Sequence, residues 1–261
     1  MEYMDQVKQV VLTIAMCAPR MLAMFSVIPF LGQSILQGMV RNSIVVSFTL
    51  MVYPMVSPTM PEQLDMITIV AVLAKEVLIG VIIGFVVSVV FWIGESVGFF
   101  IDNQRGTTMA QVVDPLSGHQ TSPLGSMFLQ LLATLFLSSG GFLLVLGGLF
   151  ETYKLWPVFS FFPNIGPEFA IFFLDLVDLL MEYTVLFAAP IIIAVFVAEY
   201  GLGLINRFAP QLNVFFLSMP IKSAVGSFIL IIYTYYVFYL LMGSDLVLGD
   251  IIQFIKNVLH E

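Results

Sequence analysis

The chain has 261 residues, of which 60% are hydrophobic and only 10% are charged, whereas soluble domains are roughly 45–50% apolar and about 25% charged. This composition excludes an ordinary soluble protein and predicts an all-α membrane protein, because the apolar runs are continuous and do not alternate like the roughly 10-residue strands of a membrane barrel. The net charge of −8 comes from scattered acids, so without a basic tract it supports neither nucleic acid as a partner nor lipid held by a polybasic patch.

The first apolar run covers residues 7–31 and is long enough for the roughly 20 residues of a spanning helix. Pro19 removes a backbone donor and is expected to bend this helix. Arg20 is expected to face protein or water, because a central arginine costs at least about 2.5–3.5 kcal/mol in lipid. Cys17 is the only cysteine, which excludes an intrachain disulfide and a thiolate metal cluster. The acidic amino terminus and the missing cleavage site predict a retained helix, not a cleaved signal peptide.

The next two runs differ in length. Residues 43–56 end among prolines and fall short of the roughly 20 residues of a span, so we interpret them as half of a hairpin. Residues 64–101 contain no proline and, at about 1.5 Å per residue, exceed a hydrocarbon core of about 30 Å. They include Lys75, Glu76 and Glu95. A simple spanning bundle does not require this combination of a short helix and an overlong one.

The longest polar interval, residues 98–126, lies between two long apolar runs and reads GFFIDNQRGTTMAQVVDPLSGHQTSPLGS. It carries Asp102, Arg105, Asp114 and His119 in a chain with few charges. Such a segment is either an ordinary solvent loop or the lining or stopper of a water-filled path. Composition alone leaves both interpretations open.

The fourth apolar run, residues 124–150, contains the pairs Gly140-Gly141 and Gly147-Gly148. We interpret these pairs as positions where helix backbones pack closely. The connector at residues 151–167 has Trp156 among prolines, which is typical of an interfacial turn with aromatic anchors.

The fifth run, residues 168–200, carries an acidic stripe, defined as Asp175, Asp178 and Glu182, whose spacing places all three carboxylates on one helical face. Carboxylates inside an apolar helix suggest a relay, so one alternative function is a proton- or ion-coupled small-solute transporter. In the other interpretation this part of the helix extends beyond the bilayer, where the stripe is solvated or paired with a neighbouring cation.

The sixth run covers residues 212–242, and a tail at residues 246–259 has its apolar residues on one face. The tail pattern predicts a short amphipathic helix that lies on a membrane or a partner. The basic residues outside the helix centres divide evenly between the two sides, so charge does not determine the orientation.

Patterns for catalysis are missing from the sequence. The two histidines are His119 and His260, and no HExxH, GxSxG or GxxxxGK[ST] motif occurs. We therefore expect a protein that is not an enzyme and that binds no cofactor or metal.

Two stretches carry a family resemblance. Residues 98–115 read GFFIDNQRGTTMAQVVDP, and residues 198–222 read AEYGLGLINRFAPQLNVFFLSMPIK. Together they resemble the FliR/SctT/YscT family, the export-gate subunit of type III secretion systems, and the likeness extends over nearly the whole chain. The connector ETYKLWP resembles the virulence injectisome branch more than the flagellar branch.

The resemblance implies one export-gate domain over residues 1–261, multi-pass in the bacterial inner membrane within the basal body of the secretion system. It implies bent helical hairpins that join FliP/SctR-family and FliQ/SctS-family subunits in a superhelical, funnel-like pore raised largely above the bilayer. Further implied partners are FlhB/SctU-family and FlhA/SctV-family components, an inner rod or adapter protein, membrane lipid and unfolded proteins in transit.

The resemblance also assigns two sets of residues. The polar interval would project into the pore as part of a plug that closes the gate at rest, with Arg105, Gly106, Met109, Asp114 and Pro115 in it. The turn at residues 199–222 is expected to be an assembly element, because a buried polar turn between apolar helices needs partners. Its residues are Arg207, Pro210, Gln211, Asn213, Phe215, Pro220 and Lys222.

Overall fold

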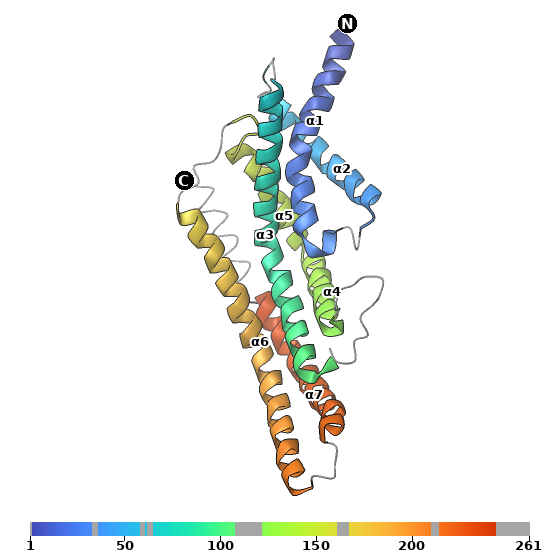
Figure 1. Cartoon of the computed structure of the whole chain (residues 1–261). Coiled ribbons are helices and arrows are strands. Elements are labelled where there is room, and N and C mark those ends of the chain that lie inside the picture. Colours follow the sequence, from blue (N-terminus) through green and yellow to red (C-terminus); the bar gives the residue numbers. More distant parts are fainter. Residues whose placement is uncertain are drawn as a thin grey trace. The chain divides into compact units, whose positions relative to one another are not determined.

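A computed structural model describes residues 2–32, 36–57, 61, 65–107, 122–160, 167–209 and 214–243. Within these ranges every regular element is a helix (Figure 1). The predicted all-α fold class is therefore confirmed. The elements in chain order are α1 (Glu2–Val27), the short 3-10 helix η1 (Pro29–Leu31), α2 (Gly38–Val56), α3 (Met66–Arg105), α4 (Pro123–Ser138), α5 (Gly141–Leu155), α6 (Pro167–Phe208) and α7 (Val214–Gly243).

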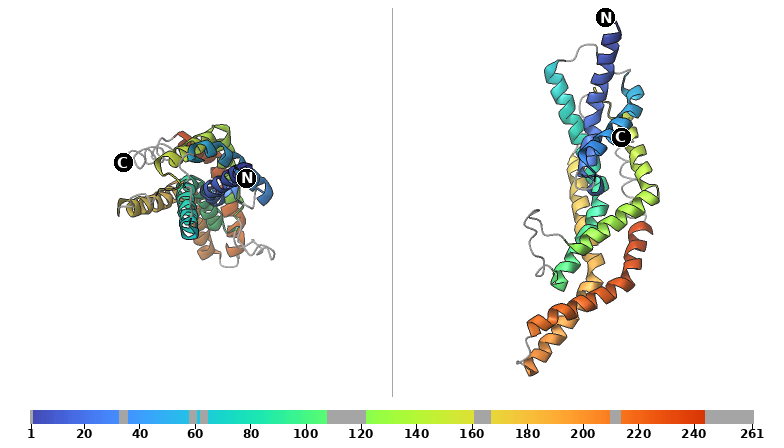
Figure 2. Two further views of the ribbon diagram at one scale, coloured as in Figure 1. Left: turned by 90° about the horizontal axis from the view of Figure 1, so that it is seen from above. Right: turned by 90° about the vertical axis from the view of Figure 1, so that its right-hand side faces the viewer.

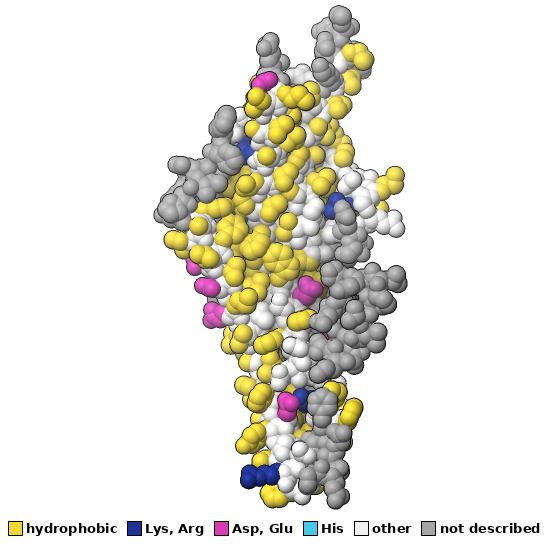
Figure 3. Space-filling model, in the orientation of Figure 1, with side chains coloured by type: hydrophobic (Ala, Val, Ile, Leu, Met, Phe, Trp, Pro, Cys, Tyr) yellow, Lys and Arg dark blue, Asp and Glu magenta, His cyan; other side chains and the backbone are white. Residues whose placement is uncertain are grey.

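Among the described residues, five helices are long and apolar enough to cross a membrane, or six if the bent pair α4 and α5 counts as one span. The expectation of about six long apolar helices is confirmed in this sense. Many large apolar side chains on these helices are exposed, and hydrophobic side chains are spread widely over the upper and middle part of the face drawn in Figure 3. Surfaces of this kind are compatible with lipid or with other subunits.

The expectation of a short second helix is wrong. α2 has 19 residues, because the segment from Gly38 to Asn42, which the apolar run left out, forms its first turn and Pro54 lies inside the helix without ending it. The expectation of an overlong third helix is confirmed, since α3 has 40 residues. At about 1.5 Å per residue this length is twice a hydrocarbon core of about 30 Å.

The fourth apolar run is two helices and not one. α4 and α5 meet at an angle of 73°, and Gly140 between them has a φ of +80°. This left-handed conformation is accessible to glycine at no steric cost and ends α4. Gly140 therefore breaks a helix and does not act as the packing position predicted from the sequence.

The described contacts group the chain into two compact units. Unit 1 comprises residues 1–89, 136–174 and 251–261, and unit 2 comprises residues 90–135 and 175–250. The long helices α3 and α6 contribute to both units.

Unit 1 has a core built around α1, α2, α5 and the first part of α3. The rings of Phe25, Phe48 and Phe142 lie with their centroids 6.3 to 6.4 Å apart. A Cβ added at Gly80 of α3 would collide with the carbonyl oxygen of Arg20 in α1. Gly80 therefore allows α3 to approach α1 at the position where α1 carries its arginine.

Unit 2 contains α4, α7 and the adjoining parts of α3 and α6. α6 and α7 lie side by side and antiparallel near their connection (Figures 1 and 2). A Cβ at Gly94 would collide with Leu132, and one at Gly98 would collide with the backbone at Gly125. These two glycines allow the last turns of α3 to pack against α4, which brings together the two ends of the polar interval.

Candidate functional site

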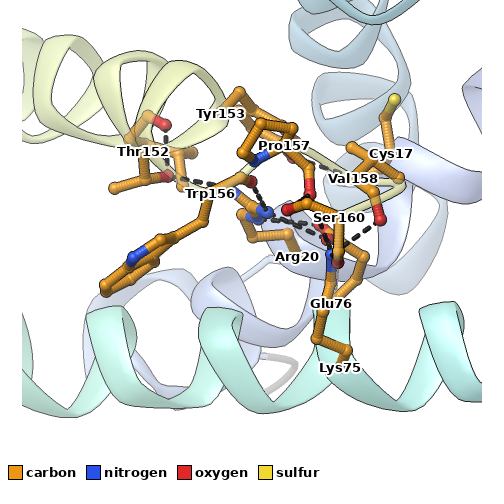
Figure 4. Close-up of polar contacts among 11 residues, drawn as sticks. Cys17, Arg20, Lys75, Glu76, Thr152, Tyr153, Trp156, Pro157, Val158 and Ser160 are labelled. Atoms are coloured by element: carbon orange, nitrogen blue, oxygen red, sulfur yellow. Dashed lines mark hydrogen bonds and ion pairs between the residues drawn. The ribbon is translucent and has the colours of Figure 1, made fainter. Parts of the chain in front are cut away.

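Three charged side chains form a cluster inside unit 1 (Figure 4). Arg20 from α1 is 0% exposed, and Lys75 and Glu76 from α3 are 4% and 0% exposed. The prediction that Arg20 faces protein or water is confirmed, because its partners are protein groups.

The Arg20 guanidinium makes a two-pronged ion pair with Glu76, with Nε 2.7 Å from Oε2 and Nη2 2.9 Å from Oε1. Nη1 also donates to the Thr152 hydroxyl at 3.1 Å, and Nη2 donates to the Trp156 carbonyl at 2.9 Å. The guanidinium carbon lies 4.1 Å from the centroid of the Tyr153 ring, a distance that permits a cation–π interaction. One side chain of α1 is thereby bound to both α3 and α5.

The Lys75 ammonium is held by backbone carbonyls of the segment that follows α5. It donates to the carbonyls of Pro157 at 2.9 Å, Val158 at 2.6 Å and Ser160 at 3.1 Å. Glu76 Oε1 lies 3.2 Å away. The cluster carries two cations and one carboxylate, and the carbonyl dipoles beyond the carboxyl end of α5 supply the remaining negative partners. This arrangement positions helices and the connector, and we assign it a structural role.

In unit 2 a single carboxylate joins the two ends of the polar interval. Asp102 Oδ2 on α3 accepts hydrogen bonds from the Ser122 hydroxyl at 2.7 Å and from the Leu124 backbone N–H at 2.9 Å. The Ser122 hydroxyl oxygen in turn accepts from the Gly125 N–H at 2.9 Å. Pro123 has no N–H, so the first two backbone N–H groups of α4 are those of Leu124 and Gly125. Both have a hydrogen-bond acceptor here, as the N-terminus of a helix requires. A buried negative charge at a helix N-terminus is also electrostatically favourable.

The described part of the plug segment ends soon after Asp102. Arg105 lies with Nη1 3.9 Å from Asp102 Oδ1 and donates from Nη2 to the Ser223 hydroxyl at 3.3 Å. Gly106 follows with a φ of +80°, so α3 ends in a left-handed turn that favours glycine. The other predicted plug residues, Met109, Asp114 and Pro115, lie outside the described residues.

The acidic stripe lies on an exposed face of α6. Asp175, Asp178 and Glu182 are all exposed, and no Lys or Arg among the described residues is in ion-pair contact with them. All three lie within α6, whose helical period would place them on one face. The structure does not enclose these carboxylates within the described part of the chain.

The predicted assembly turn is described only in part. Arg207 is exposed at the end of α6, and Lys222 Nζ lies 2.6 Å from Glu199 Oε1, which links α7 to α6. Pro220 lies inside α7. The positions Pro210, Gln211 and Asn213, together with the side chain of Phe215, lie outside the described residues, as does the predicted tail helix at residues 246–259.

The role of Asp102 did not follow from the sequence, although the residue stood within a motif, because its partners follow about 20 positions later. A usable signal was present in Ser122-Pro123, since serine followed by proline at the first helical position is typical of a helix start. The residues described here contain no group of three or more His, Cys, Asp or Glu that could hold a metal ion.

The helices able to span a membrane and their exposed apolar faces define a multi-pass membrane protein. Residues 11–244 match the family model of "Bacterial export proteins, family 1", and the chain belongs to this family. The resemblance to FliR/SctT/YscT type III secretion export-apparatus subunits is thereby confirmed.

Several relatives match over most of the chain. Yop proteins translocation protein T of Yersinia pestis is 44% identical over 230 residues, which is 88% of each chain. Surface presentation of antigens protein SpaR of Salmonella typhimurium is 30% identical over 229 residues, 87% of this chain and 85% of the relative. Flagellar biosynthetic protein FliR of Bacillus subtilis is 35% identical over 160 residues, covering 60% of this chain and 61% of the relative. The longer and closer match favours the injectisome branch.

Proposed function

We propose that this protein is a non-enzymatic subunit of the type III secretion export gate in the bacterial inner membrane, within the secretion-system basal body. It forms part of the conduit for unfolded proteins and contributes a plug that closes the conduit at rest. Its partners are the FliP/SctR-family and FliQ/SctS-family gate subunits, next to FlhB/SctU-family and FlhA/SctV-family components. Both compact units belong to this one export-gate function.

The observation that carries the plug proposal is the Asp102 junction. The polar interval leaves α3 and enters α4 at the same buried carboxylate, since Asp102 binds Ser122 and Leu124 directly. A segment fixed at both ends to packed helices can occupy a pore without being carried away when substrate passes. Glycines and methionine within it suit a soft seal, because glycine permits tight turns and methionine fills irregular space.

The test is to replace residues 108–121 with a short glycine-serine linker. The new linker can close because Asp102 already holds the two ends together. We expect raised leakage of ions or small solutes in cells that carry the assembled secretion system, measured as solute entry. Cells with the same variant but without the other gate subunits serve as the control and should not leak. Co-purification of the gate must remain intact, and intact assembly with unchanged permeability contradicts the plug.

The assembly-turn proposal rests on exposure at the tip of the hairpin of α6 and α7. Phe208 is 86% exposed and Phe216 is 70% exposed. Arg207, which precedes Phe208 in the last turn of α6, is also exposed. Lys222 already has its partner in Glu199. Large aromatic side chains next to an arginine are the residue types that carry much of the binding energy at protein interfaces. We infer that this turn contacts neighbouring gate subunits.

A transporter that uses the acidic stripe remains the competing function. If it holds, purified protein alone in liposomes should show pH-driven solute uptake that is lost in a variant with Asp175→Asn, Asp178→Asn and Glu182→Gln. Such uptake would contradict the export-gate proposal. The exposure of the three carboxylates on α6 favours solvation or a cationic neighbour over an enclosed relay.

A further inference from the structure

Arg105, the last residue of α3, lies against α7 within unit 2. Its Nη2 donates to the Ser223 hydroxyl at 3.3 Å, and its side chain is only 11% exposed. A Cβ added at Gly226 of α7 would lie 2.8 Å from Arg105 Cδ and 3.0 Å from Arg105 Cγ, which is too close for packed carbon atoms. The missing Cβ of Gly226 therefore leaves the space that the aliphatic part of Arg105 occupies.

The α7 residues near the end of α3 share one side of their helix. Met219, Ser223 and Gly226 are spaced by four and three positions within α7, which places them on one helical face. A Cβ added at Gly106, in the turn that ends α3, would lie 3.9 Å from Met219 Cγ. The end of α3 thus packs along this face, which we name the Arg105 contact face.

The Arg105 contact face is joined to α6. Lys222, which precedes Ser223, donates to Glu199 of α6 at 2.6 Å. Val195 of α6 is 0% exposed, and its Cγ2 lies 3.3 Å from the position of a Cβ added at Gly226. The contact face therefore belongs to the hairpin of α6 and α7, and a displacement of this hairpin would displace the surroundings of Arg105.

The guanidinium of Arg105 also faces the carboxylate of Asp102, one turn earlier on α3. Nη1 lies 3.9 Å from Oδ1, while Oδ2 accepts hydrogen bonds from Ser122 and Leu124 at the start of α4. Asp102 is 1% exposed, and no other Lys or Arg in the described part of the chain is in ion-pair contact with it. Because a buried charge needs a partner, Arg105 links α7 to the carboxylate that joins α3 to α4.

Arg105 is bound less firmly than the buried Arg20 of unit 1. All three guanidinium nitrogens of Arg20 have acceptors. The buried Nε of Arg105 has no hydrogen-bond partner among the residues that the structure describes, and its distance of 3.9 Å from Asp102 exceeds a hydrogen bond. An unsatisfied buried donor costs free energy that contact with water would recover. The arrangement around Arg105 is therefore easier to open than the one around Arg20.

We propose that Arg105 is a positioning residue through which the hairpin of α6 and α7 stabilises the Asp102 junction. On its contact face, Arg105 keeps the Asp102 carboxylate oriented toward the start of α4. When the hairpin moves, Arg105 leaves this face and the junction loosens. The inference rests on the proposed export-gate function, in which the tip of the same hairpin contacts neighbouring subunits. Contacts at the tip thereby control how firmly the two ends of the polar interval are held.

The test displaces Arg105 by Gly226→Ala in the purified full chain in detergent. The added methyl group enters the space of the aliphatic part of Arg105 and removes no hydrogen-bonding group. The readout is hydrogen exchange, measured by mass spectrometry, of the Leu124 and Gly125 amides, which are both bonded at the junction. We expect exchange to become faster on the order of tenfold, the effect of weakening one hydrogen bond to a charged group.

Three further variants identify the cause of a faster exchange. Gly203→Ala makes the same change in α6, where an added Cβ would meet nothing within 4 Å, and should leave the exchange unchanged. In an Arg105→Ala background, Gly226→Ala should have no additional effect, because the side chain that it displaces is gone. Ser223→Ala removes only the bond to Nη2 and should show a smaller increase. It replaces Gly226→Ala if that variant does not fold, as judged by circular dichroism.

Two results on the purified chain would overturn the role of Arg105. One is unchanged amide exchange in a folded Gly226→Ala variant. The other is an effect of Gly226→Ala that persists in full without the Arg105 side chain, which would assign the effect to Val195.

A measurement in cells separates this inference from the plug proposal. In cells with the assembled secretion system, Gly226→Ala should leak more than the wild type and less than the replacement of residues 108–121. If that replacement does not leak, the plug proposal is wrong, and amide exchange still decides the role of Arg105. If the replacement leaks while Gly226→Ala exchanges faster without leaking, the hairpin does not control the polar interval and the inference is overturned.

Discussion

Burial of three charges inside unit 1 is tolerated because each has several close partners. The charged residues are Arg20, Lys75 and Glu76. Removing charges from water costs several kcal/mol per ion, and only good geometry with further hydrogen bonds offsets this cost. Here one carboxylate faces two cations, and the Thr152 hydroxyl and the carbonyls of residues 156–160 accept further hydrogen bonds from them. The residues were visible in the apolar runs of the sequence, but the partners of Arg20 lie 56 to 136 positions away.

At this scale we predict that Glu76→Gln destabilises the protein by about 3–5 kcal/mol, because it leaves two buried cations without their carboxylate. The measurement is the free energy of unfolding of the purified chain in detergent. Glu151→Gln is the matched control, since the side chains of Glu151 and its partner Lys154 are 54% and 58% exposed. Exposed pairs contribute about 0–1 kcal/mol. Equal effects of the two substitutions would refute a structural role for the cluster.

At the scale of single helices, two glycines show how one residue type acts differently by position. Gly140 has a φ of +80° and joins α4 to α5 at their 73° bend. Gly147 lies inside α5, and a Cβ added there would meet nothing within 4 Å. Both were predicted from the sequence to have the same packing role. For Gly147 the structure shows no close neighbour among the described residues, so packing there would require another subunit.

We predict that Gly140→Ala destabilises the chain by about 1 kcal/mol, because alanine is strained in the left-handed region. Gly147→Ala should instead be neutral or stabilise α5 by up to about 1 kcal/mol, since alanine is a better helix former than glycine. Both free energies of unfolding are measured on the purified chain. A destabilisation by Gly147→Ala that matches that of Gly140→Ala would show that the bend is not what requires glycine.

For the whole molecule, the exposed apolar surface exceeds what a chain working alone in water could tolerate. Leu143 and Leu144 of α5, Phe196 of α6 and Ile231 of α7 are each at least 60% exposed. Lipid and neighbouring subunits are the two environments that can cover such side chains. Membership of the bacterial export family makes coverage by other gate components a consistent explanation.

At this scale we predict that the double substitution of Arg207→Ala and Asn213→Ala reduces co-purification of the gate complex, because the turn loses polar groups that would contact other subunits. Co-purification is measured with the FliP/SctR-family and FliQ/SctS-family proteins. Ser47→Ala is the control, since the Ser47 hydroxyl donates only to the carbonyl of Ser43 within α2. A normal yield of complex combined with lost secretion would instead indicate a direct role of the turn in transport.

The sequence by itself determined the membrane class, the helical fold, the long third helix and the family, because these follow from composition and from motifs that are local in the chain. It also placed Arg20, Lys75 and Glu76 within apolar runs. It could not determine the length of α2, because polar residues in a first turn escape a count of apolar positions.

Only the tertiary structure decided which distant groups meet. It paired Arg20 with Glu76, set the ends of the polar interval against Asp102 and left Arg41 buried beside a neutral serine. These contacts depend on how closely helices approach, which glycines such as Gly80 and Gly98 control through the absence of a Cβ. Side chains far apart in the sequence become partners only after packing has removed the water between them.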